Sequence, residues 1–185
     1  LLKNFNTEYV TDFTGMFSGC TALMNLDISS FRTSSSTSLE NMFLQCVSLT
    51  NIDLSNFETE EVTNMKGLFS GCKNLVSVNL KNLNTLIVQD MSYLFANCEK
   101  LESIDISNFE TDNVENMDSM FIYCKSLESI DLYNFKTENV QSMSSMFRGC
   151  TKLTSIDISN FITDNVESMD NLFNGCENLN DLNLG

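Results

Sequence analysis

Cysteine is the residue in this chain with the most reactive side chain, and it recurs at a fixed interval. The seven cysteines lie 26 residues apart, at Cys20, Cys46, Cys72, Cys98, Cys124, Cys150 and Cys176. In a stacked array, neighbouring cysteines would lie about 4.8 Å apart, which is within the Cα–Cα range of a disulfide. However, seven is an odd number, and side chains in a stacked register point the same way rather than toward each other.

Metal and nucleophile chemistry are weaker interpretations of the same cysteines. A tetrahedral zinc site needs ligands that converge on one point, and a straight row does not converge. The sequence contains no histidine, so a Cys–His nucleophile pair is excluded. We therefore interpret the cysteines as small buried core residues with free thiols, and disulfides, metal binding and redox roles are the alternatives.

A row of carboxylates is the second candidate for chemistry. It has the same 26-residue interval and comprises Asp27, Asp53, Asn79, Asp105, Asp131, Asp157 and Asn183. One hypothesis is that these stacked oxygens attract cations such as calcium, in which case a chelator would change the melting temperature. The alternative is that they hydrogen-bond to neighbours such as Ser103 and Ser107. A repeated row has no cleft and no distinct acid and base, so we expect no enzyme activity, no cofactor and no assigned metal site.

The interval of 26 residues applies to more than the cysteines, which indicates a stacked repeat array. A phenylalanine lies three residues before every cysteine, a leucine lies three residues after it, and each unit has a threonine: Thr7, Thr33, Thr59, Thr85, Thr111, Thr137 and Thr163. A threonine hydroxyl can satisfy the backbone groups of a corner, which is the expected role of this row. One unit cannot bury enough apolar surface to fold alone, so stacking is obligatory.

The unit from 49 to 74 illustrates the elements that would position these rows. Leu49, Ile52 and Leu54 have the spacing L-x-x-L-x-L, which predicts a short strand with the last two side chains inward and Asp53 outward. Thr59 then lies in a polar corner. The stacked strands are expected to form one parallel sheet.

The second half of the unit has the pattern of a short helix. Asn64 resembles an N-cap, and Met65, Leu68 and Phe69 have the spacing of one helical face. Gly71 lies where a left-handed C-terminal residue is expected, and the same position in other units is Gly19, Asn97, Gly149 or Gly175. Gln45 and Tyr123 depart from this rule, so we expect their units to end the helix differently.

Charge and composition exclude several classes of partner. Asp plus Glu number 25 against 10 for Lys plus Arg, which gives a net charge of −15, and 42% of the residues are hydrophobic. Such a surface repels the phosphates of nucleic acids and of anionic lipids, so we expect no nucleic-acid partner. No segment is long and apolar enough to insert into a membrane, and there is no secretion signal at the first residues.

The repeat resembles a known family. The run Met-Phe-x-Gly-Cys-x-x-Leu-x-x-Ile-Asp-Leu-Ser-Asn-Phe-x-Thr is clearest from Leu68 to Thr85 and from Met146 to Thr163. It resembles the 26-residue repeat of BspA-like leucine-rich-repeat surface proteins. The resemblance implies a leucine-rich-repeat solenoid of a surface-exposed, secreted or lipoprotein-anchored protein that adheres to host-matrix or cell-surface proteins. An asparagine ladder would have to use Asn56, Asn82, Asn108, Asn134 and Asn160, in a geometry shifted from that of the commonest leucine-rich repeat.

The predicted fold is therefore an α/β solenoid of the leucine-rich-repeat type, with one parallel sheet and a short helix in each of about seven repeats. It forms a single domain over residues 1–185. The partial repeats are 1–22 and 179–185, and the full repeats are 23–48, 49–74, 75–100, 101–126, 127–152 and 153–178. Both ends fall inside the repeat pattern, so we expect the chain to be a piece of a longer protein. End-to-end self-association through the terminal repeats is a further hypothesis.

The predicted function is non-catalytic binding of proteins through the outward face of the sheet. In solenoids the variable positions on a constant frame form the binding surface. Lys81 and Tyr133 replace serines beside the carboxylate row, so the candidate partner-binding residues are Asp53, Lys81, Asp105, Asp131, Tyr133 and Asp157. The alternative is a rigid spacer or stalk within a larger surface protein. The expected location is the cell surface or the secreted fraction, and free thiols leave the cytoplasm as the alternative.

Overall fold

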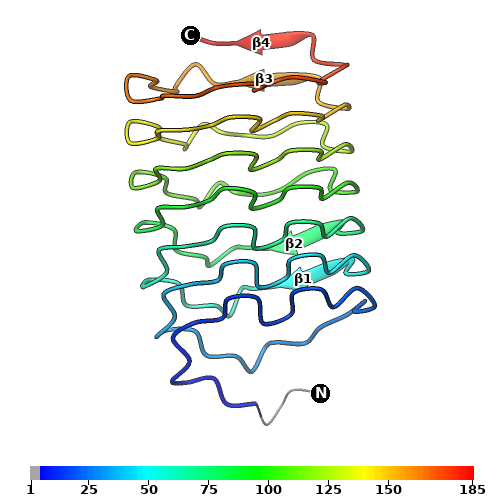
Figure 1. Ribbon diagram of the computed structural model, residues 1–185, viewed down its shortest axis with the longest axis vertical. Helices are drawn as coiled ribbons and strands as arrows, with labels where there is room; N and C mark the ends of the chain where they lie inside the picture. The colour runs from blue at the N-terminus through cyan, green and yellow to red at the C-terminus, as the bar shows by residue number, and fades with distance from the viewer. Residues whose placement is uncertain (1–4) are drawn as a thin grey trace.

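The fold is a stack of coils, one for each 26-residue repeat. The computed structural model describes residues 5–185, so residues 1–4 of the first partial repeat lie outside the described part of the chain. Figure 1 shows the coils lying one above another, from the N-terminal coil at one end to the C-terminal coil at the other. Parallel bridges join residues 26 positions apart, from Asp12–Ser38 through to Ser142–Ser168. Each repeat therefore contacts the repeats before and after it.

The core is built from vertical rows of identical side chains. Phe43, Phe69, Phe95, Phe121 and Phe147 are fully buried and stacked, and the ring centroids of neighbouring coils lie 5.5 to 5.7 Å apart. The corresponding planes differ by 4° to 10°. Buried leucines and cysteines form parallel rows beside these rings. In the central coils the repeat positions predicted to form the core are buried, because each one packs against its own equivalents in the coils on both sides.

The prediction of a short helix in each repeat was wrong: the structure has no helix among residues 5–185. Over residues 65–71, the backbone N–H groups of Met65, Gly67, Phe69 and Gly71 donate instead to carbonyls 25 residues further along the chain, at 2.7 to 2.9 Å. Of the N–H groups between them, those of Leu68 and Ser70 close four-residue turns by donating to Met65 O at 3.2 Å and Gly67 O at 3.0 Å. Met65, Leu68 and Phe69 are nevertheless buried, as the spacing predicted.

The energetic reason lies in the ends of a helix. The first four N–H groups and the last four C=O groups of any helix have no partner within it, so a helix of two turns satisfies few of its own groups. In a run of turns, every second N–H group donates to a carbonyl of the next coil, and the others donate to acceptors within their own coil. Asn64, predicted as a helix N-cap, instead caps the first of these turns, with Oδ1 accepting from Lys66 N at 2.9 Å.

Left-handed residues recur at two positions in the turn segment. The predicted position is confirmed at Gly71 (φ 75°) and Asn97 (φ 59°). Gln45 and Tyr123, which were expected to differ, have the same conformation at φ 59° and 57°. Inter-coil hydrogen bonds hold this conformation in these two units, because Gln45 N donates to Ser70 O at 2.7 Å and Tyr123 N to Arg148 O at 2.7 Å. The packing of the next coil therefore outweighs the steric preference of the individual residue.

The buried threonines connect successive corners, as predicted. Thr111 Oγ1 donates to Lys136 O at 2.8 Å and accepts from Lys136 N at 2.7 Å, so one hydroxyl satisfies both backbone groups of a residue in the next coil. Thr7, Thr33, Thr59, Thr85 and Thr137 make the same pair of bonds.

Thr111→Val should lower the free energy of unfolding by about 2 to 3 kcal/mol, because valine has the same shape but leaves two part-buried backbone groups without partners. Chemical denaturation followed by circular dichroism would measure the loss. Thr163→Val, at the exposed threonine of the last corner, is the matched control and should cost much less. Equal losses at the two sites would contradict the assigned role.

The asparagine ladder is confirmed in its shifted position. Asn108 Nδ2 donates to Leu80 O at 3.1 Å and Leu83 O at 2.9 Å, both in the preceding coil. Asn160 Nδ2 reaches Leu132 O, Tyr133 O and Phe135 O in the same way. Each amide thus satisfies carbonyls at the bend that follows the strand segment of the previous repeat.

The prediction of one continuous parallel sheet was wrong. The described residues form four strands, namely β1 (Asn51–Asp53), β2 (Ser77–Asn79), β3 (Ser155–Asp157) and β4 (Asp181–Asn183). β1 pairs with β2 and β3 pairs with β4, both in parallel, so there are two separate two-stranded sheets (Figure 1). The equivalent segments in the central coils are stacked without a ladder. None of residues 5–185 forms a helix that is long and apolar enough to cross a bilayer.

Candidate interaction surface

The strand face is the surface formed by the outward side chains of the strand segments and of the residues that follow them. At its centre lies the aspartate row, which comprises Asp27, Asp53, Asn79, Asp105, Asp131, Asp157 and Asn183. All seven side chains are exposed. The six predicted binding residues also lie on this face and are exposed, including Lys81 and Tyr133 directly after their strand segments.

Each member of the aspartate row caps the turn that follows its own strand segment. The Oδ1 atom accepts a hydrogen bond from the backbone N–H two residues later, for example from Tyr133 to Asp131 at 2.9 Å and from Ser159 to Asp157 at 2.9 Å. Where the second residue is serine, its hydroxyl can donate as well, as in Ser107 Oγ to Asp105 at 2.7 Å. The hydrogen-bonding interpretation of the row is therefore confirmed for Ser107.

These hydrogen bonds keep the carboxyl groups ionised. The hydroxyls of Ser55, Ser107 and Ser159, together with the backbone N–H groups of the same serines, hold the pKa values of the three carboxyls that they contact below the usual value. The carboxyls concerned are Asp53, Asp105 and Asp157. A hydrogen bond that favours the charged form of an acid lowers its pKa, so this face remains anionic at neutral pH.

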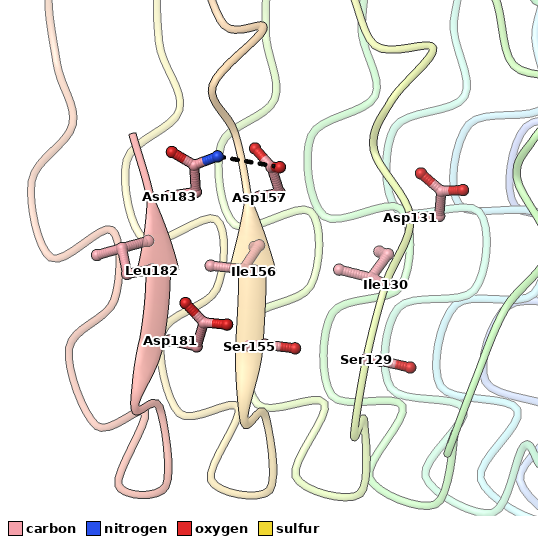
Figure 2. Close-up of a pocket in the computed structure, with 9 residues that line it drawn as sticks. All are labelled: Ser129, Ile130, Asp131, Ser155, Ile156, Asp157, Asp181, Leu182 and Asn183. Atoms are coloured by element: carbon pink, nitrogen blue, oxygen red, sulfur yellow. Dashed lines mark hydrogen bonds between the residues drawn. The ribbon is translucent and has the colours of Figure 1, made fainter. Parts of the chain in front are cut away.

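The two sheets form where a carboxylate of the aspartate row meets an amide. β1 carries Asp53 opposite Asn79 of β2, and β3 carries Asp157 opposite Asn183 of β4. Asn183 Nδ2 donates to Asp157 Oδ2 at 3.2 Å (Figure 2). An amide between two coils can thus donate to the neighbouring carboxylate, which another carboxylate cannot do.

In the central coils a carboxylate meets another carboxylate, and the strands are unpaired. Asp105, Asp131 and Asp157 occupy three successive coils, and no ladder joins their segments. Like charges directly opposite each other destabilise strand pairing. The step from Asn79 to Asp105 is also unpaired, so an amide is not sufficient by itself. We attribute the open ladder from Asp105 to Asp157 to repulsion between these carboxylates.

Asp131→Asn should raise the melting temperature by roughly 2 to 4 °C, because it removes repulsion with both neighbouring carboxylates. Asparagine keeps the turn, since Asn79 Oδ1 accepts from Lys81 N at 3.3 Å in the equivalent position. Thermal denaturation would measure the shift, and slower amide hydrogen exchange over residues 130–132 would report new strand pairing. Asp164→Asn, an exposed carboxylate in a corner outside the aspartate row, is the control. A shift of the same size in the control would show that only the net charge matters.

Three open hollows lie between the coils of the strand face. The first has a volume of about 610 Å³ and is drawn in Figure 2. Its lining residues are Ser129, Ile130, Asp131, Ser155, Ile156, Asp157, Asp181, Leu182 and Asn183. The second, of about 510 Å³, shares Ile130, Asp131 and Asp157 with the first and adds Tyr133, so the two form a continuous depression. The third, of about 460 Å³, lies further toward the N-terminus and contains Lys81 and Asp105.

The structure thus brings together five of the six predicted binding residues, three in one hollow and two in another. Asp131, Tyr133 and Asp157 line one hollow, and Lys81 and Asp105 line another. Asp53 lies on the same face but lines none of the three hollows.

The apolar residues of these hollows were not predicted from the sequence. Ile130 and Ile156 alternate with polar residues, and alternation predicts simple burial for both. In the structure, Ile156 is buried by its pairing with β4, whereas Ile130 remains half-buried and both line the first hollow. No local signal distinguishes these two isoleucines, because the difference comes from whether the adjacent strands are paired.

The cysteine row is structural in its geometry. All seven thiols are free, and the five from Cys46 to Cys150 are buried, whereas Cys20 is exposed and Cys176 is half-buried. Each buried Sγ donates to the carbonyl of a phenylalanine in the preceding coil, as Cys98 does to Phe69 O at 3.3 Å. Burial raises the pKa of Cys46 to about 11 and of Cys72 to about 12. These thiols are therefore protonated at neutral pH, when only a thiolate would be a good nucleophile or metal ligand.

The described residues also offer no ready metal centre. No group of three or more His, Cys, Asp or Glu side chains within residues 5–185 lies close enough together to hold an ion. On the strand face the carboxylates are alike in role, since each caps a turn, and the row has no pair with distinct acid and base environments. The arrangement is suited to contact with another molecule over an extended surface.

Comparison with known proteins places this geometry in a recognised class. A protein family described as "Mycoplasma protein of unknown function, DUF285" matches residues 1–100 and 68–184. No curated protein matches the sequence. Among solved structures, the leucine-rich-repeat protein of T. pallidum is similar, with 26% identity and a TM-score of 0.54 over 78% of this chain and 60% of that one.

Two further structures share the architecture. A leucine-rich-repeat protein from Eubacterium ventriosum matches with 19% identity and a TM-score of 0.50, over 77% of this chain and 35% of that one. A chain in the Toll–Spatzle complex of Drosophila matches with 19% identity and a TM-score of 0.50, over 97% of this chain and 22% of that one. This chain therefore spans less than two thirds of each of these three proteins. The predicted leucine-rich-repeat solenoid is confirmed, with the corrections to its helices and sheet given above.

Proposed function

Since the chain belongs to the DUF285 family and has a leucine-rich-repeat fold, we propose that it is a protein-binding module that contacts its partner through the strand face. Leucine-rich-repeat solenoids generally mediate protein–protein interaction, and their extended faces carry the contacts. The alternative is a structural repeat module, and the strand face provides the means to decide between them.

The exposure of Tyr133 is the observation that carries this proposal. Its side chain is 83% exposed and lines the hollow that also contains Asp131 and Asp157. Four other repeats have serine at the same position. Tyrosine is enriched among residues that dominate binding energy, because its ring buries a large area and its hydroxyl keeps a hydrogen bond. A ring of this size held in solvent above a hollow is well placed to bury against a partner.

We further propose that the whole protein is a BspA-like surface protein, located at the cell surface or secreted, that adheres to host-matrix or cell-surface proteins. The 26-residue motif supports this assignment. Burial of five thiols is compatible with an oxidising exterior, because a protonated buried thiol has no access to an oxidant or to a well-oriented partner. Each carboxylate of the aspartate row caps a turn in the same way, so the row has no distinct acid and base, and this supports a non-catalytic function.

Purified chain would be tested against a panel of immobilised extracellular-matrix and cell-surface proteins. Tyr133→Ala should weaken binding to the recognised protein by at least about ten-fold, and Lys81→Ala by a smaller factor. Tyr9→Ala is a matched control, because Tyr9 is also 83% exposed but lies in the first corner, away from the strand face.

The spacer alternative predicts a different pattern. A stalk would tolerate Tyr133→Ala and Lys81→Ala without loss of adhesion by the full-length protein, but would lose adhesion when a whole repeat, such as residues 101–126, is deleted. That pattern would overturn the binding proposal. Binding that falls equally for Tyr133→Ala and Tyr9→Ala would overturn it as well.

A further inference from the structure

Four carboxylates of the strand face, Asp53, Asp105, Asp131 and Asp157, form no ion pair within residues 5–185. The ion pairs within residues 5–185 lie elsewhere: Glu99 with Lys73 and Lys125, Asp112 with Lys136, and Glu128 with Lys152. None involves Asp53, Asp105, Asp131 or Asp157. These four charges repel their neighbours along the row, and the repulsion coincides with the open ladder between the central coils. A cation brought by another molecule would relieve it.

The spacing of the row restricts the shape of a cationic partner. Successive coils pair as parallel strands at β1–β2 and β3–β4, and paired strands lie about 4.8 Å apart, which sets the rise from one coil to the next. An α-helix has a pitch of about 5.4 Å, so a helix parallel to the solenoid axis presents one side chain per coil, at positions i, i+3 or i+4, and i+7. An extended strand presents one side chain every ~6.6 Å and loses register by about 1.8 Å per coil, whereas the helix loses only about 0.6 Å.

The hollows suit the aliphatic stems of lysine and arginine. Half-buried Ile130 and exposed Leu182 provide apolar surface in the depression that also contains Asp131 and Asp157, drawn in Figure 2. A long basic side chain can lay its methylene groups on such a surface while its charge stays near the carboxylates. Tyr133 adds an exposed ring face against which a cation can bind.

We propose that the partner of the strand face is a basic α-helix that lies along the solenoid axis and places one lysine or arginine on each of the coils that carry Asp105, Asp131 and Asp157. This inference rests on the proposed protein-binding function and specifies the chemistry of the partner. Binding relieves the repulsion between the central coils, so the ligand should also raise the melting temperature of the chain.

The test uses a helical peptide of about 18 residues with lysines at i, i+4, i+7 and i+11, and a second peptide of the same composition with the lysines distributed around the helix. Calorimetry with the whole chain should show the striped peptide binding at least about five-fold more tightly, with an affinity that falls several-fold as ionic strength rises from about 0.05 to 0.3 M. The triple variant Asp105→Asn, Asp131→Asn, Asp157→Asn should bind at least about ten-fold more weakly. Its turns are retained, because Asn183 Oδ1 already accepts from Gly185 N at 3.2 Å.

The control is a triple variant with the same change in charge, namely Glu60→Gln, Glu61→Gln, Asp164→Asn, at exposed corner positions. It should bind the striped peptide within about two-fold of the unmodified chain. Equal weakening by the two triple variants, equal affinity for the two peptides, or no binding of the striped peptide would each overturn the inference. Recognition of a matrix or cell-surface protein that depends on Tyr133, in a chain that ignores the striped peptide, would overturn this inference alone and leave the proposed function intact.

Discussion

Phe121→Ala should lower the free energy of unfolding by about 3 to 5 kcal/mol, the range observed when a buried phenylalanine is truncated. Phe121 is fully buried, and its ring stacks between Phe95 at 5.6 Å and Phe147 at 5.7 Å. Removing the ring leaves a cavity and breaks both stacking contacts, so the coils on each side lose a neighbour. In a solenoid, stability is carried by contacts between adjacent repeats, and a defect in a central coil therefore has its full effect.

Denaturant titration followed by circular dichroism would measure this loss. Phe5→Ala is the control, because Phe5 lies in the first coil and is 48% exposed. Its truncation should lower the free energy of unfolding by well under half as much. Phe121→Leu should fall between the two, since leucine fills part of the volume. A loss at Phe121 no greater than the loss at Phe5 would contradict the central role of the phenylalanine stack.

The second large effect is loss of stability at alkaline pH. Burial raises the pKa of both Cys72 and Cys124 to about 12, whereas in an unfolded chain their thiols ionise near pH 9. Above pH 9 the unfolded state therefore binds fewer protons than the folded state, and the free energy of unfolding must fall as pH rises. Each such thiol lowers the free energy of unfolding by about 1.4 kcal/mol per pH unit. The two together therefore lower it by on the order of 5 kcal/mol between pH 9 and pH 11.

Unfolding free energies measured from pH 7 to pH 11 in the presence of a reductant would test this. The variant Cys72→Ala, Cys124→Ala should be less stable at pH 7 but should lose less stability on the way to pH 11. Cys20→Ala, which removes an exposed thiol, should leave the slope of the profile as it is. Identical slopes for all three proteins would mean that the buried thiols do not cause the alkaline sensitivity.

The core was predictable because identical residues at identical spacing pack on one another. Phe121, Cys124 and Leu127 are buried in one coil for the same reason as their equivalents in the next. Thr111 and Asn108 were predictable for a related reason: a short polar side chain at a corner has few partners other than backbone groups. These properties follow from periodicity alone, and periodicity is fully visible in a single sequence.

The candidate surface was predictable in its position but not in its shape. The outward positions follow from alternation, and Lys81 and Tyr133 are visible as departures from serine. Whether Tyr133 lies flat on its neighbours or stands in solvent above a hollow depends on the side chains of the adjoining coil.

By itself, the sequence determined the 26-residue coil, the inward and outward sides, the core rows and the anionic character of the strand face. Only the tertiary structure decided that residues 65–71 form turns rather than a helix, and that the strands pair at Asp53–Asn79 and Asp157–Asn183 but not between Asp105 and Asp157. The physical reason is the same in both cases. Hydrogen bonds and charge repulsion between coils join residues that are 25 or 26 positions apart in the sequence. A local pattern such as Met65, Leu68 and Phe69 is compatible both with backbone hydrogen bonds inside its own segment, as in a helix, and with hydrogen bonds to the next coil.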